Sequence, residues 1–401
     1  MAPRKIFDFP SFDLNHRSPA VSRYHLTESE IDYVRPCTPV QAGIIAQFLH
    51  STGSMYLNHF VMEMDSNADL RALKLAWSSA HEEFEMLRTG FVETNDDKVP
   101  FAMVTYKVGT QILPWLHDDH QESICIDRQR SRGRMGSGLM ETLKTPPWRL
   151  AILEEDSRTL IEFSALHALY DAYALQMILG HVTARYHGRQ APTQRPLEPL
   201  LSNILTAIST GSEAEDRFWV EYLREVGLVR FPNLAPNRTR SNATMVVSKS
   251  CSRSQSQLET SCSQCGVSVQ AAGQAAWARI LSAYTGEKCV TFGLVLSGRL
   301  TDPDAENVVF PCINTLPIHC QVIDSSLDLM RRILDDGRQL LRYQVTPLSK
   351  IQHLTGRARQ AMFDTLFVLQ KSGDKIRDLP RPWKIIDEVA TADVSDSDRW
   401  A

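Results

Sequence analysis

The sequence lacks any long apolar run. Across its 401 residues, no stretch approaches the roughly 20 consecutive apolar residues that a membrane-spanning helix requires. Residues 1–20, "MAPRKIFDFPSFDLNHRSPA", do not contain the short apolar segment of a secretory signal. We therefore expect a cytoplasmic protein that does not use a membrane as a partner.

The chain also lacks an excess of charge of either sign. Lys and Arg number 43 against 47 Asp and Glu, so the formal net charge is −4. Nucleic-acid-binding domains usually carry clustered basic charge, so we expect no nucleic-acid partner. Hydrophobic residues make up 43% of the chain, which is ordinary for a globular protein with a buried core. At about 150 residues per domain, the length suggests two or three units.

Cysteine pairs are scarce, and so are repeats. Of eight cysteines, only Cys262 and Cys265 in "SCSQCG" stand close together, and no second CxxC or histidine pair follows at zinc spacing. We interpret them as reduced thiols in a serine-rich loop. We expect no metal site and no directly bound cofactor, and no fixed-period repeat is present.

Helix and strand patterns alternate along the chain. Thr38, Pro39 and Gln41 form a helix start with a capping box, and Asp69 caps a second helix with one apolar face. Further elements are predicted from apolar periodicity. These are strands within 149–166 around a polar turn, at 290–296 and at 364–370, and helices at 268–284 and 325–344. Residues 188–200 are polar and proline-rich, so they are the best linker candidate between two α/β halves.

A histidine and an aspartate lie where a strand pattern changes into a helical one. In "FSALHALYDAYAL" (163–175) the apolar strand runs to Leu166, and the helical pattern follows. His167 is therefore expected in the turn, where α/β folds expose side chains. Asp171 falls in the first helical turn, where the helix dipole favours a carboxylate. The spacing alone leaves two interpretations open: a catalytic pair, or a packing histidine beside an ordinary helix start.

The flanking sequence favours the first interpretation. "HALYD" resembles the core motif of condensation domains of nonribosomal peptide synthetases, in particular the fungal type. Other segments resemble further motifs of the family in the same order, from Tyr33 to Gln370. These segments are "YVRPCTPVQAGIIAQFL", "LKLAWSSAHEEFEMLRTGFV", "DRFWVEYL", "VTFGLVLSGR", "FPCINTLPI" and "MFDTLFVLQ".

The resemblance implies an α/β fold of two chloramphenicol-acetyltransferase-like lobes that form a V-shaped pseudo-dimer. A tunnel would run between the lobes, with His167 midway along it. The expected parts are an N-terminal extension over 1–30, a first lobe over 31–190, a linker over 191–205 and a second lobe over 206–401. We expect this second lobe to be incomplete, with exposed apolar surface. The family continues beyond the 364–370 strand, whereas here only "WKIIDEV" and a polar tail follow.

The resemblance also implies an activity, which is to form an amide between two substrates held as thioesters on the phosphopantetheine arms of carrier domains. His167 would position the acceptor amine and take its proton. Asp171 would support the site through an arginine, with Arg299 as the first candidate and Arg88 as the second. The implied partners are donor and acceptor carrier domains and the adenylation domains of a synthetase. The segment "TPVQAGIIAQFLHSTGSMYLNH" resembles synthetases of hydroxamate siderophores.

The sequence departs from the family pattern at three positions of the core motif. Leu166 replaces the first histidine, Ala172 replaces the glycine after the aspartate, and Ala174 replaces a common following serine. Two alternatives therefore stay open: a coenzyme A-dependent acyltransferase, which shares HxxxD, and a non-catalytic remnant that docks carrier domains. We assign no catalytic role to Asn314, Thr315 or Asp364, which can serve turns and strand ends.

Overall fold

The computed structural model describes most of the chain: residues 7–111, 113, 115–117, 138–155, 158–224, 230–232, 247–299, 305–358, 360–370 and 380–389. The chain folds into two compact units. The first contains Met1–Thr206, Arg299–Cys312 and Ser372–Ala392, and the second contains Ala207–Gly298, Ile313–Lys371 and Asp393–Ala401. Within the described residues, no helix has both the length and the hydropathy that crossing a membrane requires.

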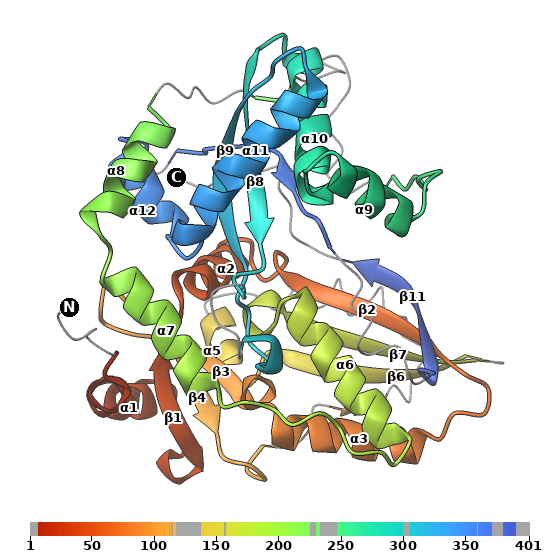
Figure 1. Ribbon diagram of the computed structural model, residues 1–401. Coiled ribbons are helices and arrows are strands. Elements are labelled where there is room, and N and C mark those ends of the chain that lie inside the picture. The colour runs from red at the N-terminus through yellow and green to blue at the C-terminus, as the bar shows by residue number, and fades with distance from the viewer. Residues whose placement is uncertain are drawn as a thin grey trace. The chain divides into compact units, whose positions relative to one another are not determined.

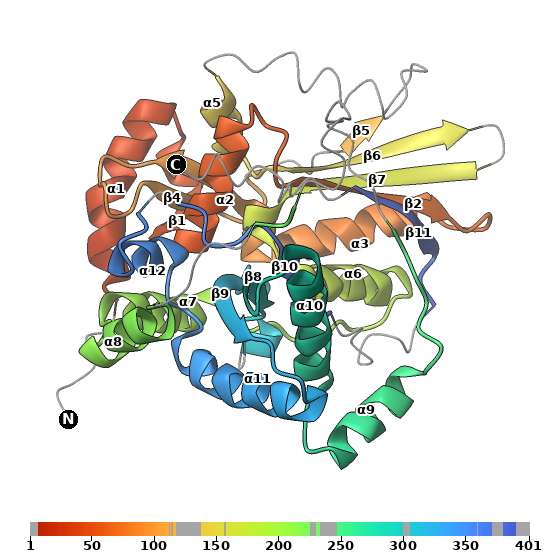
Figure 2. The same cartoon turned by 90° about the horizontal axis from the view of Figure 1, so that it is seen from above.

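The main sheet of the first unit has five strands in the order β11-β2-β7-β6-β5. Neighbouring strands are antiparallel except β5 and β6, which are parallel. The strands are β2 (Leu57–Met64), β5 (Trp115–His117), β6 (Trp148–Glu155), β7 (Arg158–Leu166) and β11 (Trp383–Val389). Helices α3 (Leu70–Glu83) and α6 (Ala172–Tyr186) pack side by side on one face (Figures 1 and 2).

Aromatic side chains fill the space between this sheet and its helices. Trp77 of α3 stacks on Phe163 of β7 with ring centroids 5.2 Å apart, and on Trp148 of β6 at 6.0 Å. All three are buried. Side chains alternate along a strand, so one face of β7 packs in this core and the side chains between point to the other face of the sheet.

A smaller sheet of the first unit has the order β1-β4-β3, all antiparallel. Its strands are β1 (Ile31–Pro36), β3 (Thr89–Glu93) and β4 (Phe101–Tyr106). Helix α1 (Phe9–Tyr24) packs on it with Phe12, Ala20 and Tyr24 buried. The other helices of this unit are α2 (Pro39–His50), α5 (Leu139–Leu143) and most of α7 (Leu197–Ser209).

The second unit has a three-stranded sheet in the order β10-β8-β9. Its strands are β8 (Cys289–Leu296), β9 (Asn314–Gln321) and the short β10 (Leu366–Phe367). Its helices are α8 (Glu213–Tyr222), α9 (Gln255–Gln264), α10 (Val269–Thr285), α11 (Ser326–Leu340) and α12 (Leu348–Leu354) (Figure 1). Its core joins Trp219 of α8, Phe292 of β8 and Leu329 of α11.

The local helix predictions are confirmed where a capping residue carried them. Thr38 and Gln41 form both bonds of the capping box, and Asp69 accepts hydrogen bonds from the first turn of α3. Apolar periodicity also predicted α10 and α11, and the structure shows Ser268 and Ser325 as their N-caps. The two strands within 149–166 are β6 and β7.

Several segments belong to a different unit or element from the one that the expected domain boundaries gave them. Residues 1–30 contain α1, which packs in the first unit, and the expected linker over 191–205 contains most of α7, with Leu200 and Leu201 buried. Arg299–Cys312 and β11 belong to the first unit, although both were placed in the second lobe. β11 pairs with β2, a contact that no local pattern reveals. The polar tail lies outside the described residues, and the completeness of the second lobe stays a prediction.

The Cys262–Cys265 loop prediction is wrong. Cys262 lies in α9, and Cys265 is the C-cap of that helix. Ser254 and Gln257 form a capping box at the start of α9. The Ser-x-x-Gln spacing was therefore the available sequence signal, although serine-rich composition pointed to a loop.

Two histidines are buried between α3 and α6. Burial, together with the charge of Arg88, lowers the pKa of His81 to about 4. Burial, together with the charge of Arg185, lowers the pKa of His181 to about 4. The unfolded chain, in which histidine titrates near 6.5, therefore binds more protons than the folded chain between these pH values. Stability must fall as the pH drops from about 6.5 towards 4.

We predict that His181→Gln reduces this acid sensitivity. Between pH 7 and pH 5, one such histidine should cost the fold about 2 kcal/mol, and a glutamine does not titrate. Denaturant unfolding of both proteins at the two pH values measures the difference. His187→Gln, at an exposed histidine, is the control and should keep the full acid sensitivity. Equal pH dependence in His181→Gln and the parent chain would contradict the prediction.

Candidate active site

His167 begins a short 3-10 turn (His167–Leu169) directly after β7. Its backbone N–H donates a 2.8 Å hydrogen bond to the carbonyl of Tyr56, just before β2. Leu57 and Leu166 are paired where the two strands meet this turn. The last rung of the β2–β7 ladder thus holds the backbone of His167, at the strand-to-helix turn where the sequence placed it.

The imidazole of His167 has a defined orientation. Its Nδ1 lies 2.8 Å from the carbonyl oxygen of Tyr170, and its ring stacks on the ring of Tyr170 with centroids 5.0 Å apart and an interplanar angle of 4°. A carbonyl oxygen only accepts hydrogen bonds, so Nδ1 carries the proton of the neutral ring. Nε2 then has a free lone pair, which is the arrangement that a base requires.

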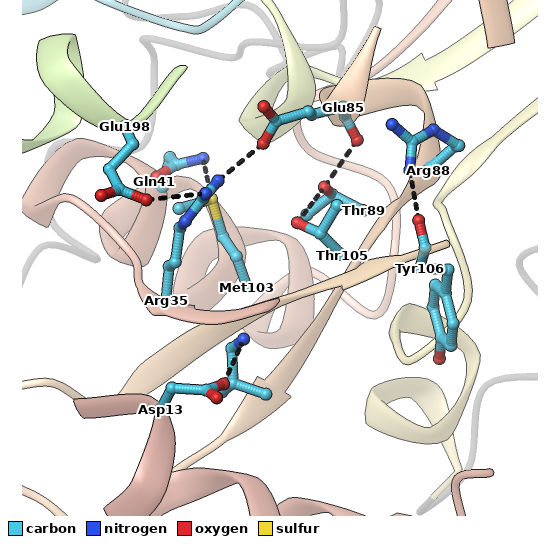
Figure 3. A network of polar contacts seen from close by, with 11 residues as sticks. Asp13, Arg35, Gln41, Glu85, Arg88, Thr89, Met103, Thr105, Tyr106 and Glu198 are labelled. Carbon is cyan, nitrogen blue, oxygen red and sulfur yellow. Dashed lines mark hydrogen bonds and ion pairs between the residues drawn. The ribbon is translucent and has the colours of Figure 1, made fainter. Parts of the chain in front are cut away.

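The turn that carries His167 is fixed by two neighbouring elements. The Asn58 side chain of β2 donates a 2.9 Å hydrogen bond to the Tyr170 hydroxyl. Gln41 of α2 donates a 3.0 Å hydrogen bond to the carbonyl of Ala168, and its side-chain oxygen accepts one from the N–H of Thr38. Gln41 therefore caps its own helix and clamps the turn. Its amide also points at the sulfur of Met103 (Figure 3).

The loop that supplies the Tyr56 carbonyl has an unusual backbone. Tyr56 has φ of +63°, and Thr52 has φ of +53°. Such left-handed conformations are uncommon for residues other than glycine and cost of order 1–3 kcal/mol each. The surrounding structure must therefore hold this loop in place, and one result is the carbonyl that accepts the His167 N–H.

Asp171 is the N-cap of α6 and is almost completely buried. Its side chain accepts a 2.7 Å hydrogen bond from the N–H of Ala174. Nη2 of Arg299 lies 3.0 Å from both carboxylate oxygens, and the N–H of Cys312 donates a further 3.0 Å bond. The ion pair expected between Asp171 and Arg299 is confirmed.

Arg299 also binds the backbone of its own loop. It donates to the carbonyls of Ala305, Val308 and Phe310, and its guanidinium lies 4.7 Å from the ring centre of Tyr173. The loop therefore closes around the arginine while the arginine holds α6. These contacts explain why Arg299–Cys312 belongs to the first unit.

Arg88, the second candidate for this pair, has a different role. Its guanidinium donates to the backbone carbonyl of Tyr106 at the end of β4 (Figure 3). Burial lowers the pKa of Arg88 and outweighs the negative charges of Glu85 and Asp32, which act to raise that pKa. Arg88 is therefore a buried structural cation of the small sheet, and its proposed pairing with Asp171 is wrong.

A neighbouring cation, Arg35, joins other parts of the first unit. It lies 2.6 Å from a carboxylate oxygen of Glu85 and 3.2 Å from one of Glu198 (Figure 3). Its guanidinium also lies 4.0 Å from the ring centre of Tyr33. Arg35 is buried and Glu198 lies in α7, so this pair ties α7 to the small sheet.

Asn314 and Asp364 lie in the second unit and bind backbone groups. Asn314 donates 2.8 Å hydrogen bonds to the carbonyls of Gln344 and Thr346, and its own oxygen accepts from the N–H of Thr315. Asp364 accepts a 2.6 Å bond from the N–H of Phe231. Both side chains therefore hold backbone segments of the second unit together.

Sequence reasoning missed four residues that hold the His167 turn: Tyr56, Asn58, Tyr170 and the clamping role of Gln41. Gln41 had a local signal, because its capping box places the side chain at the start of α2. The other three act through strand pairing and ring stacking, which depend on segments about 110 residues apart. No local pattern in the sequence reveals such contacts.

Comparison with known families decides the ancestry of this fold. The family described as "Condensation domain" matches residues 32–383. The chain belongs to the condensation-domain family. Its match covers parts of both units and includes Arg299–Cys312, so this segment that returns to the first unit is part of the family's domain.

Relatives and solved structures agree with this assignment. The nonribosomal peptide synthetase sidC of Arthroderma benhamiae is 37% identical over 97% of this chain, and the chain spans 8% of that protein. The hydroxamate-type ferrichrome siderophore peptide synthetase of Schizosaccharomyces pombe is 27% identical over 86% of the chain, which spans 7% of it. The condensation domain of the monacolin K polyketide synthase MokA has a TM-score of 0.69 at 13% identity, and the match covers 91% of this chain and 87% of that one.

We predict that Asp171→Ala destabilises the fold by about 3–5 kcal/mol, because it leaves the buried guanidinium of Arg299 without its carboxylate. Asp69→Ala is the matched control, since it removes an exposed N-cap carboxylate without a buried cation and should cost about 0.5–2 kcal/mol. Denaturant unfolding measures both. A loss in Asp171→Ala no larger than that in Asp69→Ala would show that the ion pair adds nothing beyond the cap.

Proposed function

We propose that this domain forms an amide bond between two substrates, each held as a thioester on the phosphopantetheine arm of a carrier domain. His167 Nε2 is the group that orients the acceptor amine and takes its proton. The observation that carries the proposal is the Nδ1 hydrogen bond to Tyr170, which leaves Nε2 unprotonated in the neutral ring. Membership of the condensation-domain family supports the reaction class.

The chemistry suits an imidazole. The acceptor amine, with a reference pKa of about 7.7–8.0, is partly neutral near pH 7 and can attack the thioester carbonyl directly. The C–N bond forms, the ammonium proton passes to Nε2, and the C–S bond breaks. His167 then returns the proton to the departing thiolate, so the ring ends the cycle neutral. A positioned base of this kind typically contributes about 10²–10⁴-fold.

Positioning of the two substrates should contribute more than proton transfer. Holding two reactants in line lowers the free-energy barrier of the reaction by roughly 7–11 kcal/mol. To orient the acceptor amine, His167 must itself be held in place. The hydrogen bonds that Tyr56, Asn58 and Gln41 make to its turn hold it there.

Asp171 and Arg299 act as scaffold in this proposal. Both carboxylate oxygens of Asp171 already accept hydrogen bonds, and the side chain is 2% exposed. A carboxylate with this surrounding has no free position from which to take a substrate proton. Its contribution is to fix the start of α6, and with it the turn that carries His167.

The replacement of the first motif histidine does not remove a group from the site. Leu166 is fully buried in the core of the first unit, beside the residues that pack under the sheet. A side chain in this position contacts core residues and does not contact a substrate. This observation supports a catalytic domain over a non-catalytic remnant.

The partners follow from the proposed chemistry. They are the donor and acceptor carrier domains and the adenylation domains of a larger fungal synthetase in the cytoplasm. The chain spans less than a tenth of the relatives described above. The name of the Schizosaccharomyces pombe relative supports a hydroxamate siderophore as the class of product.

We predict that His167→Ala reduces condensation by at least about 10²-fold, because it removes the base. Product formation from carrier-loaded donor and acceptor substrates, in a synthetase that contains this domain, is the measurement. His353→Ala, at an exposed histidine of α12, is the control and should leave the rate unchanged. A His167→Ala variant that keeps the parent rate would exclude His167 as the base.

A further inference from the structure

Two cysteines lie one turn apart at the end of helix α9 in the second unit. Cys262 is in the last turn of the helix, and Cys265 is its C-cap. Both are free thiols; Cys265 is exposed and Cys262 is partly exposed. The condensation reaction proposed above uses neither of them.

The backbone at this end of α9 holds the two residues close together. The N–H of Cys265 donates hydrogen bonds to the carbonyl of Cys262 at 3.1 Å and to that of Ser261 at 3.3 Å. The first is the bond of a 3-10 turn, in which side chains three residues apart lie above each other. In an α-helix and in a 3-10 helix, Cα atoms three residues apart are separated by roughly 5–6 Å. Disulfide-bonded cysteines have Cα atoms about 4.4–6.8 Å apart, so the backbone spacing already suits a disulfide.

A small movement of the last turn is enough to join the two sulfur atoms. Cβ atoms three residues apart on a regular helix are roughly 5–6 Å apart, whereas a disulfide needs about 3.5–4.5 Å. Gly266, with φ of +70°, ends the helix directly after Cys265, and helix ends fray at little cost. None of the residues of α9 is buried, so its last turn can tighten without disturbing a core.

The same turn leads directly into a core helix. The N–H of Val267 donates a 3.0 Å hydrogen bond to the carbonyl of Cys262, and Ser268 is the N-cap of α10. Val267 is buried, and α10 contributes side chains to the core of the second unit. A bond between Cys262 and Cys265 therefore closes the corner through which α9 enters α10.

We propose that Cys262 and Cys265 form a reversible dithiol–disulfide site that exchanges two electrons with small disulfides, of which oxidised glutathione is the probe. The thiolate of the more exposed Cys265 attacks one sulfur of the glutathione disulfide, and one glutathione leaves. The thiolate of Cys262 then attacks the Cys265 sulfur, the internal disulfide forms, and the second glutathione leaves. The protein loses two protons and two electrons, and the glutathione disulfide gains them as two thiols. Excess reduced glutathione reverses both steps.

The internal disulfide is favoured over a glutathione adduct by the short separation. A thiol on a short tether acts at an effective concentration on the order of mM. Cys251 and Cys289 are also exposed but lack such a neighbour: Cys251 lies before α9, outside any helix or strand, and Cys289 pairs with Gln321. The buried Cys320 next to Gln321 points to the other face of the sheet. Cys251 and Cys289 should therefore stop at the glutathione adduct and serve as internal controls.

Peptide mapping of the unsubstituted domain tests whether the bond forms. The protein is treated with oxidised glutathione at about pH 8, where thiols begin to ionise, and the remaining thiols are alkylated. Trypsin then cleaves after Arg253 and Arg279, which places both cysteines in one peptide and Cys251 in another. Peptide 254–279 should have lost two hydrogen atoms and should carry neither alkyl group nor glutathione. Free thiols, glutathione adducts or a link to Cys251 in place of the internal bond would each overturn the proposal.

The dependence on glutathione concentration distinguishes an internal disulfide from an adduct. Closing the internal bond releases two glutathione molecules for each disulfide consumed, whereas an adduct releases one. Tenfold dilution of both forms of glutathione at a constant ratio should therefore raise the ratio of disulfide to dithiol in peptide 254–279 about tenfold. The adduct on Cys251 should not change. An oxidised fraction of peptide 254–279 that does not respond to dilution would contradict the proposal.

Single substitutions test the order of the two steps. In Cys262→Ser the second step is blocked, so Cys265 should accumulate the glutathione adduct. Cys251→Ser is the matched control and should form the internal disulfide as the parent does. Because α9 buries no residue, the Cys262→Ser variant should fold as the parent does. An unmodified Cys265 in Cys262→Ser would reject Cys265 as the attacking thiol and, with it, the proposed exchange.

The disulfide should also restrict the corner between α9 and α10. Amide hydrogen exchange at Cys265 and Val267 should be slower in the oxidised protein than in the reduced protein, because the closed bond opposes fraying of the turn. Cys262→Ser, treated in the same way, should show no such difference. Equal exchange in the two forms would show that the bond does not fix this corner. None of these measurements uses the condensation reaction, so their outcome is independent of that of His167→Ala.

Discussion

The buried ion pair between Asp171 and Arg299 is the interaction on which the site depends. It joins the first turn of α6 to a segment more than a hundred residues later, and backbone N–H and carbonyl groups make additional hydrogen bonds to both side chains. A buried pair recovers its desolvation cost only when such additional bonds are present. The pair therefore requires the backbone of residues 305–312, and the chain must return to the first unit to supply it.

His167 gains its fixed position from this constraint. Only three residues separate it from Asp171, so anchoring the start of α6 limits the turn at its far end. The Tyr56 carbonyl anchors the near end, and Gln41 and Asn58 hold the middle. In the proposed function His167 is the reacting group, which must be held within about 0.5 Å, and a turn anchored at both ends and in the middle restricts its movement.

The sequence predicted the features that depend on short-range interactions. Thr38, Gln41 and Asp69 act within one helical turn, so their patterns predicted α2 and α3. The pairing of Asp171 with Arg299 is long-range, and only the resemblance to condensation domains brought it into view. The place of α1, the pairing of β11 with β2, and the contact of His59 with Glu162 had neither a local pattern nor a family motif. Each depends on which strands become neighbours, which composition and periodicity do not encode.

The two histidines on this strand pair differ in what holds Nδ1 of each ring. Nδ1 of His59 lies against the buried side chains of Glu162 and Ser164 on β7, so strand pairing orients that ring. Nδ1 of His167 donates to the carbonyl of Tyr170, which belongs to the same turn as His167. The orientation of the His167 ring therefore depends on the geometry of that turn and, through Asp171, on the segment that carries Arg299. A change far from His167 in the sequence that displaces this segment therefore reaches the ring through the turn.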